Sequence, residues 1–301
     1  MESAAPAKWQ ILSVVACLLG VLSKEMIVTA PVMVLLYDRT FVAGSFLEAG
    51  RRRWRYYLGL AGMWLLLVPL LTGVHQRSAG FGLGVTWWRY ALNSCRSVVL
   101  YLKLAVWPHP LVLDYGTDIV HHAGEVIPYM MVLAVLVVGT AIALWRRPVV
   151  GFAGAWVFVI LAPASSVVPL AGQPMAEHRM YLPLAAVIGL GVLGLYARMG
   201  RRSLLVFAAA AMGLGWLTIQ RNQDYRSELA IWSDTVAKRP NNERAHNNLG
   251  AAWSRMPGRL QDAIAQYETA LRLQPEDAEA HNNLGVAWSH LPGRRDDADA
   301  Q

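Results

Sequence analysis

Apolar residues dominate the first 220 positions of the chain, in long runs separated by short polar loops. A helix that crosses a bilayer needs about 20 predominantly apolar residues, with a range of roughly 17–25. Seven runs reach or approach that length: 9–23, 26–37, 56–74, 126–145, 149–169, 181–197 and 203–220. Polar and charged residues prevail from position 221 onwards. The pattern predicts a multi-pass membrane domain over 1–220 and a soluble domain over 221–301.

One further segment, residues 87–107, mixes apolar residues with cations. Arg89, Arg96 and Lys103 follow one another at intervals of seven. Seven residues make nearly two helical turns, so the three side chains share one helix face. The pattern predicts an amphipathic helix that either lies at the membrane interface or lines a cavity.

Arginines cluster in the loops that follow the second, fourth and sixth apolar runs. They are Arg39, Arg51, Arg52, Arg53, Arg55, Arg146, Arg147, Arg198, Arg201 and Arg202. Cytoplasmic loops carry an excess of lysine and arginine, and all these loops share that side only if 87–107 does not cross. We therefore predict seven crossings plus one amphipathic helix, in a bacterial inner membrane or an ER-type membrane. Residues 221–301 then lie outside the cytoplasm.

Charge and cysteine content agree with a membrane protein. Only 16% of the residues are charged, whereas a soluble domain holds about 25%. The net charge is +7, and the arginines lie beside apolar runs, which favours membrane topology over nucleic-acid binding. Cys17 and Cys95 both lie in apolar segments, so no disulfide framework is implied.

The polar tail repeats itself. Residues 240–258 and 275–293 match with an offset of 35, close to the tetratricopeptide period of about 34. The matched pairs are Pro240 and Pro275, His246 and His281, Leu249 and Leu284, Gly250 and Gly285, and Trp253 and Trp288. The match predicts that Gly250 lets two helices approach closely and that Trp253 and Trp288 fill the core between helices. The residues expected to pack and end the second helix are Ala263, Tyr267, Ala270 and Pro275.

The repeat array looks partial. Residues 224–239 resemble a lone second helix, with Trp232 and Thr235 at the positions of Tyr267 and Ala270. Because repeat arrays need about three units and a polar cap for stability, we expect C-terminal truncation. The predicted fold class is all-α, a polytopic transmembrane helical domain followed by a short tetratricopeptide α-solenoid.

Four motifs together resemble one family. They are SKEMIVTAPVMVLLYDRT (23–40), WWRYALNSCRSVVLYLKLAVWPHPLVLDYG (87–116), MAEHRMYLP (175–183) and RNQDYRSELAIW (221–232). Their order and spacing resemble the transmembrane and tetratricopeptide-repeat O-mannosyltransferases and their bacterial relatives. The resemblance implies transfer of a sugar, with mannose as the expected one, from a polyprenyl phosphate to a hydroxyl of a protein or polymer outside the cytoplasm.

Enzymes of this type carry acidic catalytic residues in an early extracytoplasmic loop. No such loop is present in this sequence, so we expect the N-terminal catalytic segment to be missing and assign no catalytic residue. The alternative function is a non-enzymatic, membrane-anchored repeat scaffold that binds proteins. A transporter is a third hypothesis, although no inverted repeat of spans is evident.

Several residues are candidates for the donor site. Arg89, Arg96, Lys103 and Arg179 could bind the phosphate of a lipid-linked sugar through charge-assisted hydrogen bonds. The alternative for the first three is an interfacial helix whose cations reach lipid headgroups. Lys24 and Glu25, between two short apolar runs, are either functional residues at membrane depth or a solvated turn.

Acidic and polar residues supply the other candidates. Glu177 and His178 could act as acid and base, or Glu177 and Arg179 could fix the loop as a structural cap. Asp114 is equally compatible with substrate contact and a turn cap, since its loop holds no lysine or arginine. Asn248 and Asn283 could bind peptide backbone on the concave repeat face, or occupy solvated positions. His121 and His122 have no third ligand at metal spacing, so we predict no metal.

Overall fold

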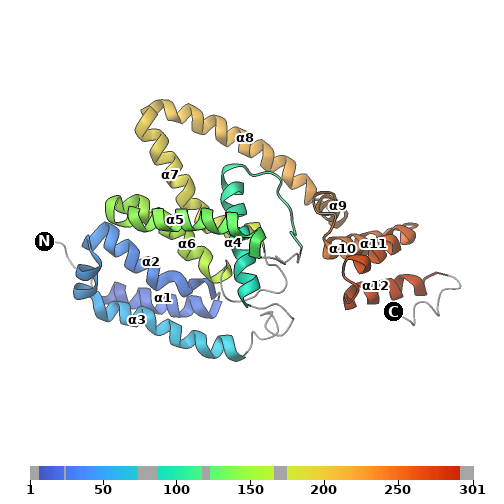
Figure 1. The fold of residues 1–301 in the computed structure, drawn as a ribbon, viewed down its shortest axis with the longest axis horizontal. Coiled ribbons are helices and arrows are strands. Elements are labelled where there is room, and N and C mark those ends of the chain that lie inside the picture. The colour runs from blue at the N-terminus through green and yellow to red at the C-terminus, as the bar shows by residue number, and fades with distance from the viewer. Residues whose placement is uncertain (1–6, 24, 74–86, 117–122, 166–174, 292–301) are drawn as a thin grey trace. The chain divides into compact units, whose positions relative to one another are not determined.

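A computed structural model describes residues 7–23, 25–73, 87–116, 123–165 and 175–291. Every regular element in these ranges is a helix (Figure 1). The chain divides into two compact units, which are described separately. The first unit comprises 1–107, 119–174 and 178–194, and the second comprises 108–118, 175–177 and 195–301.

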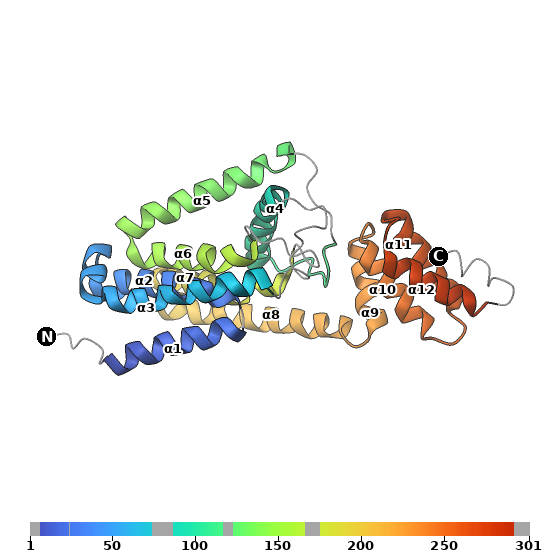
Figure 2. The same ribbon diagram turned by 90° about the horizontal axis from the view of Figure 1, so that it is seen from below.

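The first unit is built mainly from apolar helices. They are α1 (Ala7–Ser23), η1 (Glu25–Thr29), α2 (Ala30–Tyr37), η2 (Asp38–Ala43), α3 (Phe46–Gly73), α4 (Trp87–Val106), η4 (Ala123–Glu125), α5 (Ile127–Arg146), α6 (Pro148–Ser165), η5 (Glu177–Met180) and α7 (Tyr181–Met199). Helix α7 extends from the first unit into the second, and Glu177 of η5 belongs to the second. Helix α1 packs against α3, and α5 forms a hairpin with α6 (Figure 2).

Each predicted apolar run contains helix, but two of them differ from a simple span. The second run begins as a 3-10 helix and becomes α2 near Pro31. Proline is accommodated there because the amide hydrogens of a first helical turn have no intrahelical partner. The third helix begins at Phe46, well before the predicted position 56, and its backbone departs from helical geometry at Arg53 (φ −134°, ψ 26°).

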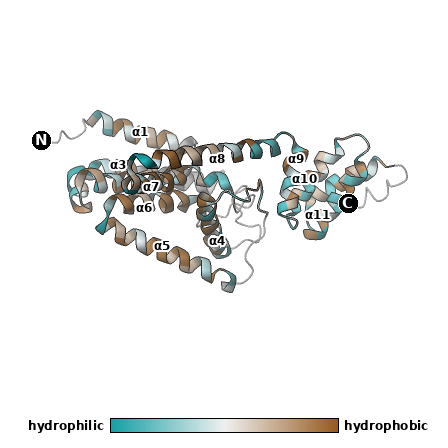
Figure 3. Ribbon diagram, turned by 90° about the horizontal axis from the view of Figure 1, so that it is seen from above, coloured by the Kyte–Doolittle hydropathy of each residue, from teal (hydrophilic) through white to brown (hydrophobic). Residues whose placement is uncertain are grey.

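Within the described residues, two stretches are long and apolar enough to cross a membrane, Ile127–Arg146 and Glu177–Asp224. Two shorter apolar helical stretches, Ala7–Val21 and Pro148–Pro163, fall below that length. Most of α6 and α7 is hydrophobic, whereas hydrophilic residues prevail on the helices of the tail (Figure 3). Membrane character is thus supported by composition at two stretches, and seven crossings stay a prediction.

The α5–α6 hairpin is tight because two glycines lie at its interface. A Cβ atom on Gly151 would lie 2.2 Å from the backbone nitrogen of Leu144. A Cβ on Gly154 would lie 2.6 Å from Oγ1 of Thr140. Only glycine leaves room for such close helix approach.

The second unit ends in a helical array. After η6 (Gly200–Arg202), its elements are α8 (Ser203–Asp224), α9 (Glu228–Lys238), α10 (Glu243–Ser254), α11 (Leu260–Leu273) and α12 (Ala278–Ser289). Helices α10, α11 and α12 pack side by side (Figures 1 and 2). Side chains at the N-caps start three of these helices: Ser227, Asn242 and Asp277 each accept backbone N–H bonds.

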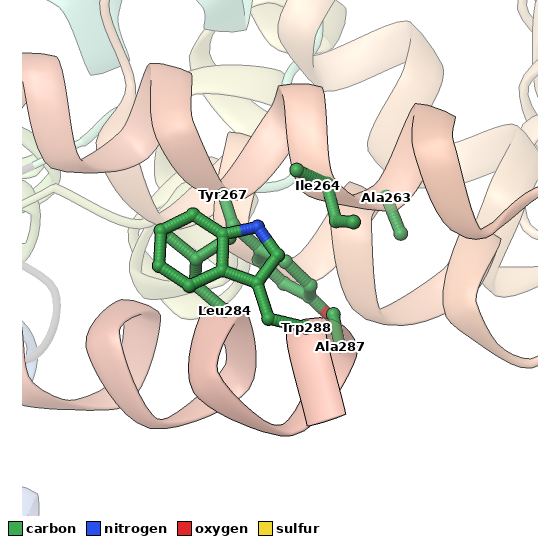
Figure 4. Packing of buried hydrophobic residues seen from close by; sticks show 6 residues of the cluster. All are labelled: Ala263, Ile264, Tyr267, Leu284, Ala287 and Trp288. Carbon is green, nitrogen blue, oxygen red and sulfur yellow. The ribbon is translucent and has the colours of Figure 1, made fainter. Parts of the chain in front are cut away.

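The core of the array lies between α11 and α12 (Figure 4). It contains Ala263, Ile264 and Tyr267 from α11 and Leu284, Ala287 and Trp288 from α12. Ala263, Tyr267 and Ala270 are 0%, 3% and 0% exposed, which confirms that they pack the second helix. A Cβ on Gly250 would lie 2.6 Å from the Tyr267 ring, so the close approach expected at this glycine is also confirmed.

Two more repeat positions have a clear structural use. Nε2 of His246 donates to the carbonyl oxygen of Pro240 at 2.9 Å, and Nε2 of His281 donates to that of Pro275 at 2.7 Å. Each bond satisfies a backbone carbonyl oxygen in the loop just before α10 or α12. The matched spacing between proline and histidine therefore corresponds to the same local hydrogen bond in both repeats.

We expect the two matched tryptophans to differ in their contribution to stability. Trp288 is 9% exposed within the core, whereas Trp253 is partly buried at its edge. Trp288→Ala should lower the free energy of unfolding by about 3–5 kcal/mol, and Trp253→Ala by less. Urea unfolding of the 221–301 fragment, followed by circular dichroism, measures both changes. A Trp288→Ala fragment as stable as the parent would contradict this core assignment.

Candidate functional site

Residues 108–116 form a loop that is held against the repeats within the second unit; we call this loop the strap. Nζ of Lys238 donates to the carbonyl oxygen of Leu111 at 3.0 Å. Nδ2 of Asn242 donates to the carbonyl oxygen of Asp114 at 3.0 Å. Side chains at the end of α9 and the start of α10 therefore satisfy backbone carbonyls of a segment more than 120 residues earlier in the chain.

Asp114 is the charged anchor of the strap. Its Oδ1 lies 3.0 Å from Nη2 of Arg244 and also accepts the Gly116 N–H at 2.7 Å. The Asp114 residue is only 6% exposed, so its carboxylate is shielded from water, whereas the Arg244 side chain is 27% exposed. Gly116 has a φ of +81°, a conformation that favours glycine. The carboxylate thus both caps a turn and binds a cation.

The cation that pairs with Asp114 comes from outside the strap. The sequence left substrate contact and a turn cap open for Asp114, and the turn cap is present in the structure. The cation is Arg244, which comes from the repeats 130 residues away. Local sequence gives no signal for such a partner. Substrate contact by Asp114 stays untested.

Glu177 ties a third segment to the strap. Its Oε1 accepts the Val112 N–H at 2.7 Å and the Tyr115 hydroxyl at 2.6 Å. The guanidinium of Arg239 lies 5.0 Å from the centroid of the same tyrosine ring, in reach of a cation–π interaction. Glu177 therefore has the structural role that the sequence analysis gave as its alternative to acid–base chemistry.

The other two residues of that motif belong to a different unit. His178 and Arg179 follow Glu177 within η5, yet both fall in the first unit. His178 is exposed, Arg179 is half-buried, and each has an interaction partner. The predicted acid–base–phosphate triplet is therefore divided between the units, and its catalytic role stays a prediction.

A charge network supports the lysine that holds the strap. The carboxylate of Asp234 accepts hydrogen bonds from Nζ of Lys238 at 2.8 Å and from Nη1 of Arg221 at 2.7 Å. Burial alone would raise the pKa of Asp234, but the hydrogen bonds from Lys238 and Arg221 outweigh it, and the pKa is lowered. The fold therefore favours the ionised carboxylate. This contribution to stability is present above the unfolded pKa and is lost as the pH falls through the lower folded pKa.

The two repeat asparagines make different contacts despite their matched positions. Nδ2 of Asn248 donates to the Arg244 carbonyl oxygen at 2.9 Å within its own helix. Nδ2 of Asn283 donates to Oδ1 of Asn247 at 3.0 Å, joining α12 to α10. Both amides thus use a donor inside the protein. Neither contact tests whether the remaining donor and acceptor capacity binds peptide.

The basic residues of α4 lie on its less buried side. Arg89 and Lys103 are exposed and Arg96 is half-buried. The guanidinium of Arg89 lies 5.4 Å from the Trp88 ring. The buried residues of α4 include Tyr90, Asn93, Ser94, Ser97, Val98 and Tyr101. The helix is thus amphipathic over Trp87–Val106, close to the predicted 87–107, and no carboxylate in the described part of the chain pairs with its three cations.

A polar cluster that the sequence pattern did not predict surrounds Asp38. This residue is 3% exposed, and its carboxylate accepts from Nη1 of Arg53 at 2.8 Å and from the Tyr57 hydroxyl. The departure of α3 from helical geometry occurs at the same arginine. A cavity of about 420 Å³ adjoins the cluster, lined by Trp9, Tyr37, Asp38, Arg53, Phe152 and Trp156 among others. The one available signal was an aspartate directly before an arginine-rich loop.

Some predicted residues cannot be placed. Lys24 and His121–His122 lie outside the described residues, and the structure describes the backbone of Glu25 but not its side chain. Within the described ranges, no three histidine, cysteine, aspartate or glutamate side chains gather in a way that could hold a metal ion.

Comparison with known proteins supports two statements. Residues 257–288 match the model of the TPR repeat. A stretch of 126 residues is 29% identical to protein O-mannosyl-transferase Tmtc3 of Drosophila melanogaster, covering 40% of this chain and 14% of that protein. No solved structure matches. The tail is therefore a TPR repeat region, and the chain has distant similarity to an O-mannosyltransferase, while kinship with bacterial proteins stays an expectation.

The Asp114–Arg244 pair yields a direct test of the strap. Asp114→Asn and Arg244→Gln should each lower the free energy of unfolding of the second unit by about 1–3 kcal/mol, because each removes one partner of a hydrogen-bonded ion pair whose carboxylate is buried. The double variant should lose less than the sum. Urea unfolding of the full chain in detergent measures these values.

The chain offers a matched control for this cycle. Glu228 and Arg255 also form an ion pair, but their side chains are 64% and 67% exposed. Glu228→Gln should therefore change stability by no more than about 0.5 kcal/mol. Additive effects of Asp114→Asn and Arg244→Gln would show that the pair does not hold the strap.

Proposed function

We propose that this chain is part of a membrane glycosyltransferase. It transfers a hexose, with mannose as the first choice, from a polyprenyl phosphate to a hydroxyl of a protein or polymer outside the cytoplasm. The observation that carries the proposal is the combination of TPR repeats with similarity to Tmtc3, an O-mannosyl-transferase by name. Because the chain covers 14% of that protein, donor, acceptor and activity are all part of the proposal.

Membrane residence is supported by apolar surface that water would disfavour. Helix α5 has no buried residue although it is strongly apolar, and Val135 on it is 71% exposed. Leu205 and Trp216 on α8 are 77% and 62% exposed. Contiguous apolar surface of this kind needs a cover, and bilayer lipid supplies one. We propose seven crossings, an amphipathic α4 and an extracytoplasmic tail over residues 221–301.

The basic side of α4 is the proposed donor site. Arg96 is its central cation and is half-buried, so partial desolvation would strengthen its bond to a phosphate oxygen. Asn93 and Ser97, which flank it, are 5% and 2% exposed, and the hydroxyl of Ser97 donates to the Asn93 carbonyl. We therefore assign the phosphate contact to the guanidinium rather than to these neighbours. Arg89, Lys103 and Arg179 are the secondary candidates.

The repeats are the proposed acceptor site. TPR repeats bind proteins through helix faces, and an amide side chain offers both a donor and an acceptor to a bare peptide group. Asn248 and Asn283 are the proposed contacts. Glu177 and His178 stay candidates for proton transfer, Asp114 for substrate contact, and Lys24 and Glu25 for a role at membrane depth. No catalytic nucleophile is proposed.

One observation favours the alternative, a membrane-anchored TPR scaffold without enzymatic activity. Asp114 and Glu177 each accept two hydrogen bonds from the protein itself. Carboxylates engaged in this way are well suited to hold the strap on the repeats. A scaffold needs only that architecture and a protein partner.

The donor site can be tested with Arg96. Arg96→Ala should weaken binding of a labelled polyprenyl phosphate to the full chain in detergent by about 10-fold or more, the value of one charge-assisted hydrogen bond. Arg96→Lys should weaken it less, since lysine keeps the charge but loses the planar fork. Parent-like binding by both Arg96→Ala and Arg89→Ala would reduce α4 to an interfacial anchor and favour the scaffold.

Topology is tested by reporter fusions at Gln301. We expect a reporter that works only outside the cytoplasm to be active there, because an odd number of crossings follows a cytoplasmic N-terminus. A fusion within the loop around Arg146 and Arg147 is the control and should be active only with a cytoplasmic reporter. Cytoplasmic activity at Gln301 would refute the seven-crossing arrangement.

A further inference from the structure

Arg39 is a buried cation whose hydrogen-bonding capacity is unused. The residue lies in the π-helical segment η2 and is 6% exposed. Within the described residues, its Nε and Nη1 atoms are buried and have no hydrogen-bond partner. The hydroxyl of the next residue, Thr40, is likewise buried and unpartnered there. Two adjacent residues thus present buried polar groups that no described residue satisfies.

The nearby carboxylates do not solve this problem. Asp38 is engaged by Arg53 and Tyr57. Glu48 accepts from Nε of Arg52 at 2.6 Å. Among the described residues, Arg39 makes a cation–π contact with Phe46, whose ring centroid lies 5.5 Å from the guanidinium carbon.

The energies show that this contact is too weak. A cation–π contact is worth about 0.5–2 kcal/mol. Removing a guanidinium from water without a partner costs several kcal/mol. The described residues therefore leave this charge undercompensated, and the exposed 6% of Arg39 gives an anion a point of approach.

The surroundings define what kind of anion fits. Exposed apolar side chains lie on the same segment and the start of α3: Tyr37 is 53% exposed, Phe41 48% and Leu47 81%. Exposed Arg51 and Arg55 follow in the same basic region. A ligand that matches both features has a negative head and an apolar body.

We propose that Arg39, with Thr40, binds the phosphate of an anionic glycerophospholipid. A guanidinium and a hydroxyl suit a phosphate, which offers several acceptor oxygens. Clusters of arginine beside membrane helices attract anionic lipids, and π-helical turns are frequent at functional sites. The inference rests on the membrane residence proposed above, but it is independent of sugar transfer and of the α4 donor site.

The test uses the full chain, purified from membranes in a maltoside detergent and stripped of lipid. Phosphatidylglycerol, phosphatidylcholine and inorganic phosphate are titrated separately, and binding is read by native mass spectrometry. Arg39→Met should weaken phosphatidylglycerol binding by about 10-fold or more, the value of a charge-assisted hydrogen bond. Arg202→Met, an exposed arginine of another loop on the same predicted side of the membrane, is the matched control and should bind within about twofold of the parent.

A second readout separates a ligand site from a structural role. In lipid-free detergent, Arg39→Met should raise the melting temperature, because the variant removes a buried charge without a partner. A purely structural arginine would give the opposite sign. If Arg39→Met does not accumulate, Thr40→Val replaces it, and this variant should also bind phosphatidylglycerol more weakly than the parent.

The remaining outcomes are decisive. Equal binding of phosphatidylglycerol by the parent and both variants overturns the site. Inorganic phosphate that competes fully with the lipid at equal concentration overturns the lipid assignment. A chain absent from the membrane fraction overturns the proposed membrane residence itself, whereas a membrane-resident chain without selective phosphatidylglycerol binding overturns this inference alone.

Discussion

A charge that leaves water needs a partner, and this constraint organises both units. Asp114 is partnered by Arg244, Asp38 by Arg53, and Asp234 by Lys238 and Arg221. The Asp114 and Asp38 pairs each join two segments that are separate in the sequence, so each pair fixes a tertiary contact as well as a charge. Removing Arg53 would leave the buried Asp38 carboxylate without its cation, at a cost greater than the value of the bond itself. Arg39 stands out because the same rule predicts a partner there and the described residues supply none.

Sequence reasoning worked where the information is local or periodic. The offset of 35 located the repeats. The matched Gly250, and the alanines and tyrosine expected to pack the second helix, lie in close contact or are buried as the repeat register requires. The basic face of α4 followed from a spacing of seven. In both cases helix geometry converts intervals in the sequence directly into positions on a face.

Reasoning from the sequence could not find partners that only the tertiary fold brings together. Asp114 seemed to lack a cation because its loop has none, whereas its cation is Arg244 on α10. Glu177 looked like one member of a motif with His178 and Arg179, yet its contacts are to Val112 and Tyr115. Asn248 and Asn283 match in sequence but bond differently, because one faces its own helix and the other a neighbouring repeat.

The strap bears on the choice between enzyme and scaffold. Lys238 and Asn242 bind backbone carbonyls of the strap, and such contacts tolerate many side chains at those positions. Asp114 and Glu177 contribute side-chain oxygens that accept hydrogen bonds, so both carboxylates have a structural role in holding the strap. This structural role is the one that a scaffold needs.

The cations of α4 differ in this respect. The described part of the chain contains no carboxylate that pairs with Arg89, Arg96 or Lys103. The positive charge of these residues favours an anionic ligand, and both anionic membrane lipid and a lipid-linked sugar phosphate meet that requirement. Binding of the lipid-linked sugar at α4, rather than the acidic residues of the strap, is therefore the property that separates a donor-binding enzyme from a scaffold.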